Sequence, residues 1–177
     1  MTAALGGRKG ADMAKKKPIM TNAMRSLASK GIEYEAVEYE TDGVIEEHFG
    51  MVIAEKTGIP PETSFKTLVL KGEKTGITVA CIPVCRELDL KKFAAAAGEK
   101  KFEMIHVKDL LALTGYIRGG VSPVGMKKKY PTFIDASCQN HDKIAISAGV
   151  CGCTLILKTA DVLAVTDAKC ADITRKD

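Results

Sequence analysis

Two apolar runs near the middle of the chain restrict its fold more than any other feature. They occupy residues 65–71 and 77–83, and the linker between them, residues 72–76, begins and ends with glycine. Apolar runs of this length, bounded by turn residues, are typical of strands, and so short a linker favours antiparallel pairing. We therefore predict a β-hairpin at the centre of the fold.

The first run of this hairpin contains a lysine. Because side chains alternate between the two faces of a strand, Lys66 shares a face with Leu68 and Leu70. Two interpretations stay open. The stem covers apolar surface while the ammonium reaches water, or the ammonium is positioned for chemistry, as a cation that stabilises an oxyanion or as a base with a lowered pKa. Periodicity alone favours the first. Thr67, on the opposite face, offers a hydroxyl hydrogen bond.

The rest of the chain alternates between helix and strand patterns. Thr21, Asp89 and Thr159 are suited to cap helices. The predicted helices cover residues 21–30, 47–57, 90–97, 108–113 and 160–164, with a further helix at the C-terminus. Additional strands are predicted at residues 32–40, 102–107, 132–136, 143–147 and 154–158. Because strands dominate the centre, we predict a mixed α/β fold with substantial antiparallel pairing.

The length of 177 residues and the hydrophobic content of 46% fit one folded domain. We expect it to span residues 19–177, after a disordered basic leader at residues 1–18. The leader alone accounts for the net charge of +4, which argues against a uniformly basic nucleic-acid surface and against DNA as a partner. No apolar run approaches the roughly 20 residues of a membrane span, and the N-terminus lacks a signal-peptide core, so we expect a cytoplasmic protein with no membrane partner.

The residue types that bind metals show no metal-site spacing. Cys81 and Cys85 are separated by three residues and Cys151 and Cys153 by one, so neither pair has the CxxC spacing of a zinc site. The three histidines show no ligand spacing either. We expect reduced thiols, no metal and no cofactor. A redox or metal protein that uses its six cysteines stays open as a weaker alternative.

A glycine-rich loop at residues 119–125 is the second segment whose residues could take part in binding or catalysis. Gly119 and Gly120 allow successive amides to converge on an anion or a carbonyl oxygen, near Ser122 and Pro123. The loop lacks the GK[ST] end of a P-loop and the Gly-x-Ser-x-Gly pattern of a nucleophile elbow. An ordinary turn-rich loop is the alternative.

Two charged features follow this loop. Lys127, Lys128 and Lys129 are candidate phosphate contacts, and a solvated charge run is an equal alternative. Asp135 ends an apolar strand, where a carboxylate can cap a turn or orient a lysine or a substrate amine.

Together these features resemble the YbaK/EbsC family of aminoacyl-tRNA deacylases over roughly residues 20–177. The motifs that carry the resemblance are Phe-Lys-Thr-Leu at 65–68, Leu-Asp-Leu-Lys-Lys at 88–92, Thr-Gly-Tyr at 114–116, Gly-Gly-Val-Ser-Pro-Val-Gly at 119–125 and Pro-Thr-Phe-Ile-Asp at 131–135. Within the family, the chain is most similar to the bacterial Cys-tRNA(Pro) deacylase type. It departs from the family pattern at residues 84–87, 136–138 and 151–153, which bears on substrate preference.

The resemblance implies a compact α/β domain, in which a mixed and mostly antiparallel sheet curls toward a barrel with helices around it. It implies a trans-editing enzyme that deacylates Cys-tRNA(Pro), with Cys-tRNA(Cys) as a further substrate and prolyl-tRNA synthetase as a candidate partner beside tRNA(Pro). Lys66 is the implied catalytic residue. The residues implied to line the pocket are Tyr39, Thr67, Gly119, Gly120, Ser122, Pro123 and Asp135.

The nucleophile that the resemblance implies belongs to the substrate. The thiol of the misattached cysteine attacks its own ester carbonyl, while Lys66 and loop amides bind the oxyanion. Two alternatives stay open: an Ala-tRNA(Pro) deacylase of the same fold that activates water, and a non-catalytic module that binds tRNA or a synthetase.

Overall fold

The predicted hairpin lies at the centre of the structure, a computed structural model that describes residues 19–176. Strands β2 (Phe65–Gly72) and β3 (Gly76–Pro83) pair antiparallel, with Lys66 opposite Ile82. The Glu99 carboxylate holds the linker closed, because it accepts hydrogen bonds from the amides of Lys74 at 2.8 Å and Thr75 at 3.0 Å. The predicted leader, residues 1–18, lies outside the described residues.

The strands within residues 19–176 form two sheets. The bounds of the remaining strands are β1 (Glu35–Glu38), β4 (Phe102–Met104), β5 (Thr132–Asp135), β6 (Lys143–Ser147), β7 (Cys153–Lys158) and β8 (Lys169–Ala171). The larger sheet has the order β4-β2-β3-β5-β8, antiparallel from β4 to β3 and parallel from β3 to β8, and the smaller sheet, β1-β7-β6, is antiparallel throughout. A backbone bridge between Ser64 and Ala145 connects the start of β2 to the smaller sheet. The mixed, mostly antiparallel α/β class is therefore confirmed.

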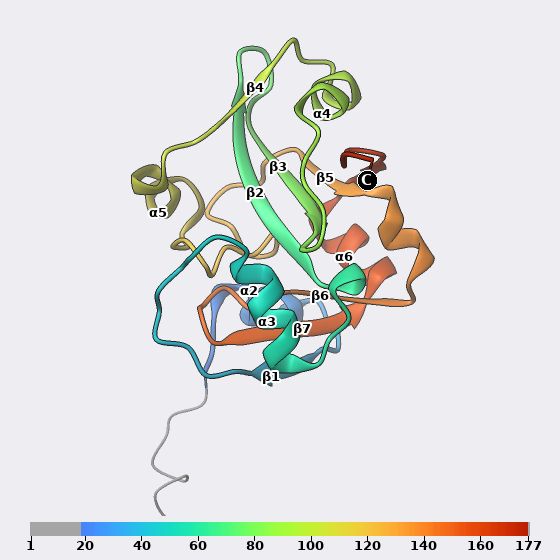
Figure 1. Ribbon diagram of the computed structural model, residues 1–177. Helices are drawn as coiled ribbons and strands as arrows, with labels where there is room; N and C mark the ends of the chain where they lie inside the picture. Colours follow the sequence, from blue (N-terminus) through green and yellow to red (C-terminus); the bar gives the residue numbers. More distant parts are fainter. Residues whose placement is uncertain (1–18, 177) are drawn as a thin grey trace, which may run out of the picture.

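Figure 1 shows how the helices surround these sheets. The long hairpin rises above the layer formed by β1, β6 and β7, with α3 in front of that layer and α4 and α5 on opposite sides of the hairpin. The helices are α2 (Asn22–Ser29), α3 (Phe49–Thr57), α4 (Leu90–Ala97), α5 (Leu110–Thr114) and α6 (Thr159–Thr166). Short 3-10 turns are η1 (Pro61–Thr63), η2 (Val107–Asp109) and η3 (Ala136–Asn140). No helix within residues 19–176 is long and apolar enough to cross a membrane.

Two of the three predicted helix caps are confirmed. The Thr21 hydroxyl accepts from the Met24 amide at 3.2 Å, and the Asp89 carboxylate accepts from the amides of Lys91 and Lys92. The predicted cap at Thr159 is wrong. Thr159 is already the first residue of α6, and its hydroxyl donates to the His141 carbonyl at 2.6 Å, which ties the helix start to the turn before β6.

The predicted C-terminal helix is also wrong. Residues 169–171 form β8, which extends the larger sheet by pairing parallel with β5. The segment is held there by burial, since Ile173 is fully buried against the core that includes Phe93. A three-residue strand carries too little periodicity to be distinguished from a helix in the sequence.

The hairpin contributes to two hydrophobic cores because its side chains alternate between faces. Val79 and Cys81 of β3 belong to the larger core, which includes side chains from α2, β6 and β7. Ala80 and Ile82 belong to the smaller core around Phe93 of α4. In Figure 1, α4 lies beside the upper part of the hairpin, and β6 and β7 lie below it. One element thus joins both cores.

Candidate functional site

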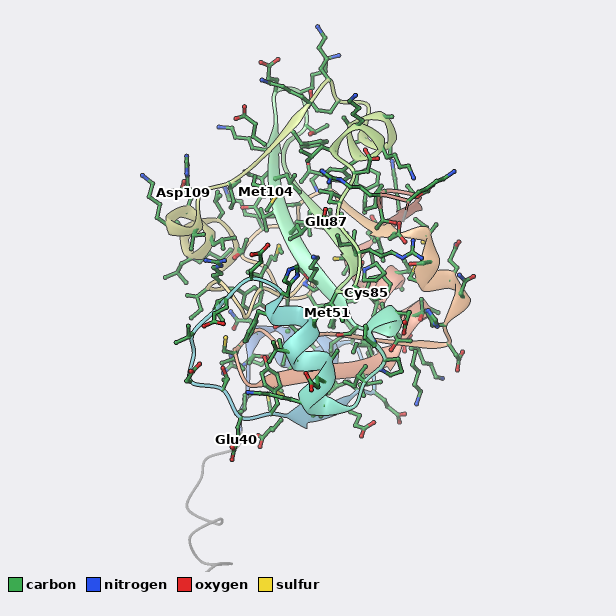
Figure 2. The ribbon with its side chains drawn as sticks, viewed as in Figure 1. Glu40, Met51, Cys85, Glu87, Met104 and Asp109 are labelled. Carbon is green, nitrogen blue, oxygen red and sulfur yellow. The ribbon has the colours of Figure 1, made fainter. Side chains whose placement is uncertain are left out.

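A cavity of about 770 Å³ opens beside the first residues of β2. Its walls come from the hairpin, from α3 and the residues before it, from the segment between β4 and α5, and from the loop that contains Gly119. Figure 2 shows four lining residues around this region: Met51 of α3, Cys85 and Glu87 of the segment after β3, and Met104 of β4. The volume is in the range of ~300–1,000 Å³ that is typical of small-molecule sites.

Lys66 lines this cavity. Burial decreases toward the cavity along its strand face: Leu70 is fully buried, whereas Leu68 and Lys66 are partly buried. Removal from water lowers the pKa of the Lys66 ammonium, and the nearby Glu87 and Cys85 side chains act in the opposite direction. The stem therefore covers apolar surface, and the half-buried ammonium faces a space that a substrate can enter.

Thr67 and Tyr39 line the same cavity. The Thr67 hydroxyl lies 3.8 Å from the Cys81 sulfur, which packs in the core behind the strand. Tyr39 directly follows β1, and its amide donates to the Gly152 carbonyl at 2.9 Å. Burial raises the pKa of the Tyr39 phenol, so this side chain is a neutral hydroxyl near pH 7.

Close contacts explain why two consecutive glycines begin the 119–125 loop. A β-carbon on Gly119, which has a φ of +88°, would clash with Ile45 and lie 2.7 Å from the Cys151 sulfur. A β-carbon on Gly120 would lie 2.9 Å from the Val150 Cα, a backbone atom that cannot move independently. The loop therefore packs directly on the turn between β6 and β7.

Only part of this loop offers amides to a ligand. The Gly120 amide donates to the Ile117 carbonyl and the Val124 amide to the Ser122 hydroxyl. Gly119 and Val121 line the cavity, and no hydrogen bond within residues 19–176 occupies their amides. These two amides are the loop donors that can act on a bound carbonyl oxygen.

Four predicted pocket residues do not line the cavity. Gly120, Ser122 and Pro123 are buried in the loop, where they support its shape. Asp135 is 3% exposed, and its carboxylate accepts from the Ser137 hydroxyl at 2.6 Å and the Ile173 amide at 3.1 Å. It anchors η3 and the C-terminal segment, and a direct substrate contact by any of the four stays a prediction.

The lysine run is exposed and lies outside the cavity lining. Lys127, Lys128 and Lys129 are solvent-exposed, and Lys129 pairs with Asp167 at 3.6 Å between Nζ and Oδ2. Both partners are more than 70% exposed, so the pair adds little stability. Phosphate binding by this run stays a prediction for parts of a nucleic acid outside the cavity.

The cavity also contains charged side chains to which the sequence analysis assigned no role. Arg86, Glu87 and Arg118 line it, together with His48, which precedes α3 with a φ of +62°. Glu87 pairs with Arg175 at 3.1 Å, whereas no ion pair within residues 19–176 involves Arg86 or Arg118. Arginines in loops follow no periodicity or motif spacing, so the sequence did not identify them as cavity residues. The position of Arg118 directly before Gly119 was the one available indication.

The cysteines differ in their surroundings. Cys85 is exposed and lines the cavity, whereas Cys81 and Cys138 are buried, and burial raises the pKa of both buried thiols to about 12. The Cys138 and Cys170 sulfurs lie 3.7 Å apart. In the described part of the chain, no group of three or more His, Cys, Asp or Glu side chains is arranged to hold a metal ion.

This arrangement suits reactions that develop negative charge on a carbonyl oxygen. A half-buried ammonium and two residues whose amides make no hydrogen bond within residues 19–176 line one cavity. Such donors stabilise an oxyanion most strongly when water is excluded. Among the described cavity residues, no serine or threonine is hydrogen-bonded to a histidine, a lysine or a carboxylate. The protein hydroxyls therefore lack the activating base that a serine-type nucleophile requires.

Comparisons with known proteins point to one group. The family model described as "Aminoacyl-tRNA editing domain" matches residues 51–165. EbsC of Enterococcus faecalis, provisionally named a Cys-tRNA(Pro)/Cys-tRNA(Cys) deacylase, is 46% identical over 93% of this chain and 100% of its own length. The Escherichia coli K12 protein named multifunctional Ser/Thr-tRNA deacylase ProXp-y is 24% identical over 93% of this chain and 98% of its own length.

Two further matches concern proline-specific proteins. Part of a proline–tRNA ligase from Thermosipho africanus is 33% identical over 43% of this chain, which corresponds to 13% of the ligase. A crystal structure whose title provisionally describes a trans-editing enzyme for prolyl tRNA synthetase covers 90% of this chain and 100% of its own, with a TM-score of 0.78 and 23% identity. At that identity the match shows a common fold.

Proposed function

This chain belongs to the aminoacyl-tRNA editing domain family, and from that premise we propose that it removes cysteine from mischarged Cys-tRNA(Pro). Cys-tRNA(Cys) is the second proposed substrate, as the name of EbsC states for that protein. The physical need for such an enzyme is clear, because a synthetase pocket built for proline rejects a similar-sized amino acid only weakly.

We propose that the substrate supplies the nucleophile. The cysteine thiolate attacks the carbonyl carbon of its own ester, a carbon–sulfur bond forms, and the bond between that carbon and the ribose oxygen breaks. The ribose oxygen takes up a proton, which balances the one that the thiol lost, and becomes a hydroxyl. The amino acid leaves as a cyclic thioester that water hydrolyses. The lack of a base-activated hydroxyl among the cavity residues supports this mechanism.

The catalytic role proposed for Lys66 is charge stabilisation. Its ammonium and the amides of Gly119 and Val121 bind the oxygen that becomes negative during the attack, while Tyr39 and Thr67 shape the pocket beside it. The observation that carries this proposal is the half-buried Lys66 ammonium in a cavity that also contains two unoccupied amides. Losing one donor of this kind costs roughly 2.7–4 kcal/mol of transition-state stabilisation.

The first prediction is that Lys66→Ala folds normally and deacylates Cys-tRNA(Pro) about 10²–10³-fold more slowly than wild type, because the oxyanion loses its charged donor. Single-turnover rates on tRNA(Pro) charged with cysteine give the comparison, and thermal unfolding checks the fold. Lys71→Ala is the matched control, since Lys71 is an exposed lysine on the same strand and does not line the cavity. A near-normal rate for Lys66→Ala would exclude this role.

A panel of charged tRNAs separates the substrate alternatives. Ser-tRNA(Pro) replaces the thiol by a hydroxyl, so equal cleavage would exclude the thiol mechanism and would match the activity named for ProXp-y. Cleavage of Ala-tRNA(Pro) that is faster than that of Cys-tRNA(Pro) would indicate a mechanism in which water attacks the ester, because alanine has no thiol. A non-catalytic module predicts tRNA binding that survives Lys66→Ala and no release of any amino acid.

We propose tRNA(Pro) as the nucleic-acid partner and prolyl-tRNA synthetase as the protein partner. The support is the partial match to a proline–tRNA ligase, in which a related segment belongs to the synthetase chain itself. The charge balance outside residues 1–18 predicts modest intrinsic affinity for tRNA. A synthetase that presents the tRNA would supply the missing affinity. Pull-down of prolyl-tRNA synthetase by this protein, with and without tRNA(Pro), tests this association.

A further inference from the structure

We propose that the mouth of the cavity contains a subsite for the terminal nucleotide of the substrate, in which Arg118 binds the phosphate and an apolar edge binds the base. The apolar edge consists of Met104, Val107, Leu111 and Ile117. This proposal rests on the proposed function, because it concerns the same cavity and the same substrate.

The apolar edge is unusual because large apolar side chains are gathered there in solvent. Met104, Val107, Leu111 and Ile117 are each more than 50% exposed. They come from β4, η2, α5 and the residues directly after α5, and Met104 and Val107 line the cavity. Figure 2 places Met104 and Asp109 on the α5 side of the hairpin, the side on which these elements lie in Figure 1.

Arg118 identifies the kind of occupant that this edge fits. It directly follows Ile117, lines the cavity, and makes no ion pair within residues 19–176. A planar guanidinium binds phosphate through two parallel hydrogen bonds. Apolar side chains can pack against the face of an unpaired base. A nucleotide combines these two groups in one ligand.

The position of the subsite fits the substrate. An aminoacyl ester joins the amino acid to the last ribose of a single-stranded end, so a nucleotide must lie next to the reacting carbonyl. Lys66 and Gly119 line the same cavity as Arg118, Met104 and Val107. Two of the four edge residues and the proposed oxyanion donors therefore line one cavity, and Leu111 and Ile117 extend the edge along the chain beside it. The exposed lysines at 127–129 do not line it.

Three cysteine esters of increasing size test the subsite: cysteine methyl ester, 3′-O-cysteinyl-adenosine, and 3′-O-cysteinyl-adenosine 5′-monophosphate. We expect Arg118→Gln to raise KM about tenfold for the phosphate-containing ester alone. Leu111→Ser is expected to raise KM several-fold for both adenosine esters and to leave the methyl ester unchanged. kcat stays within twofold throughout, because neither side chain touches the reacting carbonyl in this proposal.

Controls distinguish failure of the subsite from failure of the proposed function. Arg25→Gln removes an exposed arginine of α2 that does not line the cavity, and it should change no KM value. If the variants change KM equally for all three esters, or change no KM value, the subsite proposal is wrong. Cleavage of the esters by wild type would still uphold the proposed function. If wild type cleaves neither these esters nor Cys-tRNA(Pro), the proposed function fails. The affinity for adenosine 5′-monophosphate still tests the subsite, because an unchanged affinity in Arg118→Gln would refute it.

Discussion

At the scale of single residues, Lys66 shows how one side chain satisfies two interpretations. Its stem continues the apolar face of β2, and its ammonium is half-buried in the cavity. The cost of removing the ammonium from water lowers its pKa. A cation held in this way stabilises negative charge better than a fully hydrated one, because less water screens it.

The second prediction concerns the pH dependence of this residue. If the ammonium form is required, kcat/KM for Cys-tRNA(Pro) falls as pH rises through the Lys66 pKa, at a lower pH than the ~10.4 of an ordinary lysine. Deacylation rates, corrected for uncatalysed hydrolysis, measure this alkaline limb. Lys66→Arg keeps its charge over the same range, so its remaining activity should lack the fall. The substrate thiol also ionises in the alkaline range, so the comparison with Lys66→Arg is needed. A rise in wild type that is absent in Lys66→Arg would indicate that neutral Lys66 acts as a base.

At the scale of elements, the hairpin depends on a residue from outside it. Glu99 follows α4, is 8% exposed, and accepts from two linker amides and from the Thr75 hydroxyl at 3.3 Å. A β-carbon on Gly72 would clash with the Glu99 side chain, so the glycine allows this close approach. The hydrogen bonds, led by that from the Thr75 amide, lower the pKa of Glu99.

The third prediction follows from the sign of this shift. A carboxylate whose pKa is lower in the folded state adds stability above its unfolded pKa of about 4.3, and this stability disappears as pH falls through the folded value. We expect the stability difference between wild type and Glu99→Gln to shrink as the pH falls below about 4.3. Urea unfolding from pH 7 to pH 3 measures it.

The matched control for this prediction is Glu73→Gln. Glu73 belongs to the same linker, is exposed, and accepts no hydrogen bond within residues 19–176. Its unfolding curve should follow that of wild type at every pH. A constant difference between wild type and Glu99→Gln from pH 7 to pH 3 would contradict the role given to the Glu99 charge.

At the scale of the whole molecule, two cores share the hairpin, and the cavity opens beside it. Phe93 of α4 stacks on Phe102 with ring centroids 4.4 Å apart in the smaller core, and Leu155 of β7 is fully buried in the larger core. Because consecutive residues of β3 enter different cores, neither core can lose its packing without disturbing the strand that supports the other.

The fourth prediction is that both cores unfold in one transition. Phe93→Ala should lower the free energy of unfolding by about 3–5 kcal/mol and Leu155→Ala by about 2–5 kcal/mol, each through lost burial and a new cavity. Leu90→Ala, at a 44% exposed position of α4, should change it by less than about 0.5 kcal/mol. Far-UV circular dichroism and tyrosine fluorescence should give coincident urea curves, whereas separate curves would mean that the cores unfold independently.

Local signals account for the part of the fold that was predicted correctly. The hairpin follows from two apolar runs and a short glycine-bounded linker, and the caps at Thr21 and Asp89 follow from hydrogen bonds within one turn of helix. The errors at Thr159 and at residues 169–171 involve partners that are distant in the chain, the His141 carbonyl and strand β5. Neighbouring residues carry no information about such partners.

The sequence by itself determined the α/β class, the central hairpin, the lysine on its apolar face and, through its motifs, the family to which the chain belongs. Only the tertiary structure decided which side chains share the cavity with Lys66. It shows that Gly120 packs against the turn between β6 and β7, that Asp135 anchors the C-terminal segment, and that Arg118 lines the cavity. The physical reason is that periodicity and capping act over a few residues, whereas a cavity is formed by loops whose positions depend on how both cores pack.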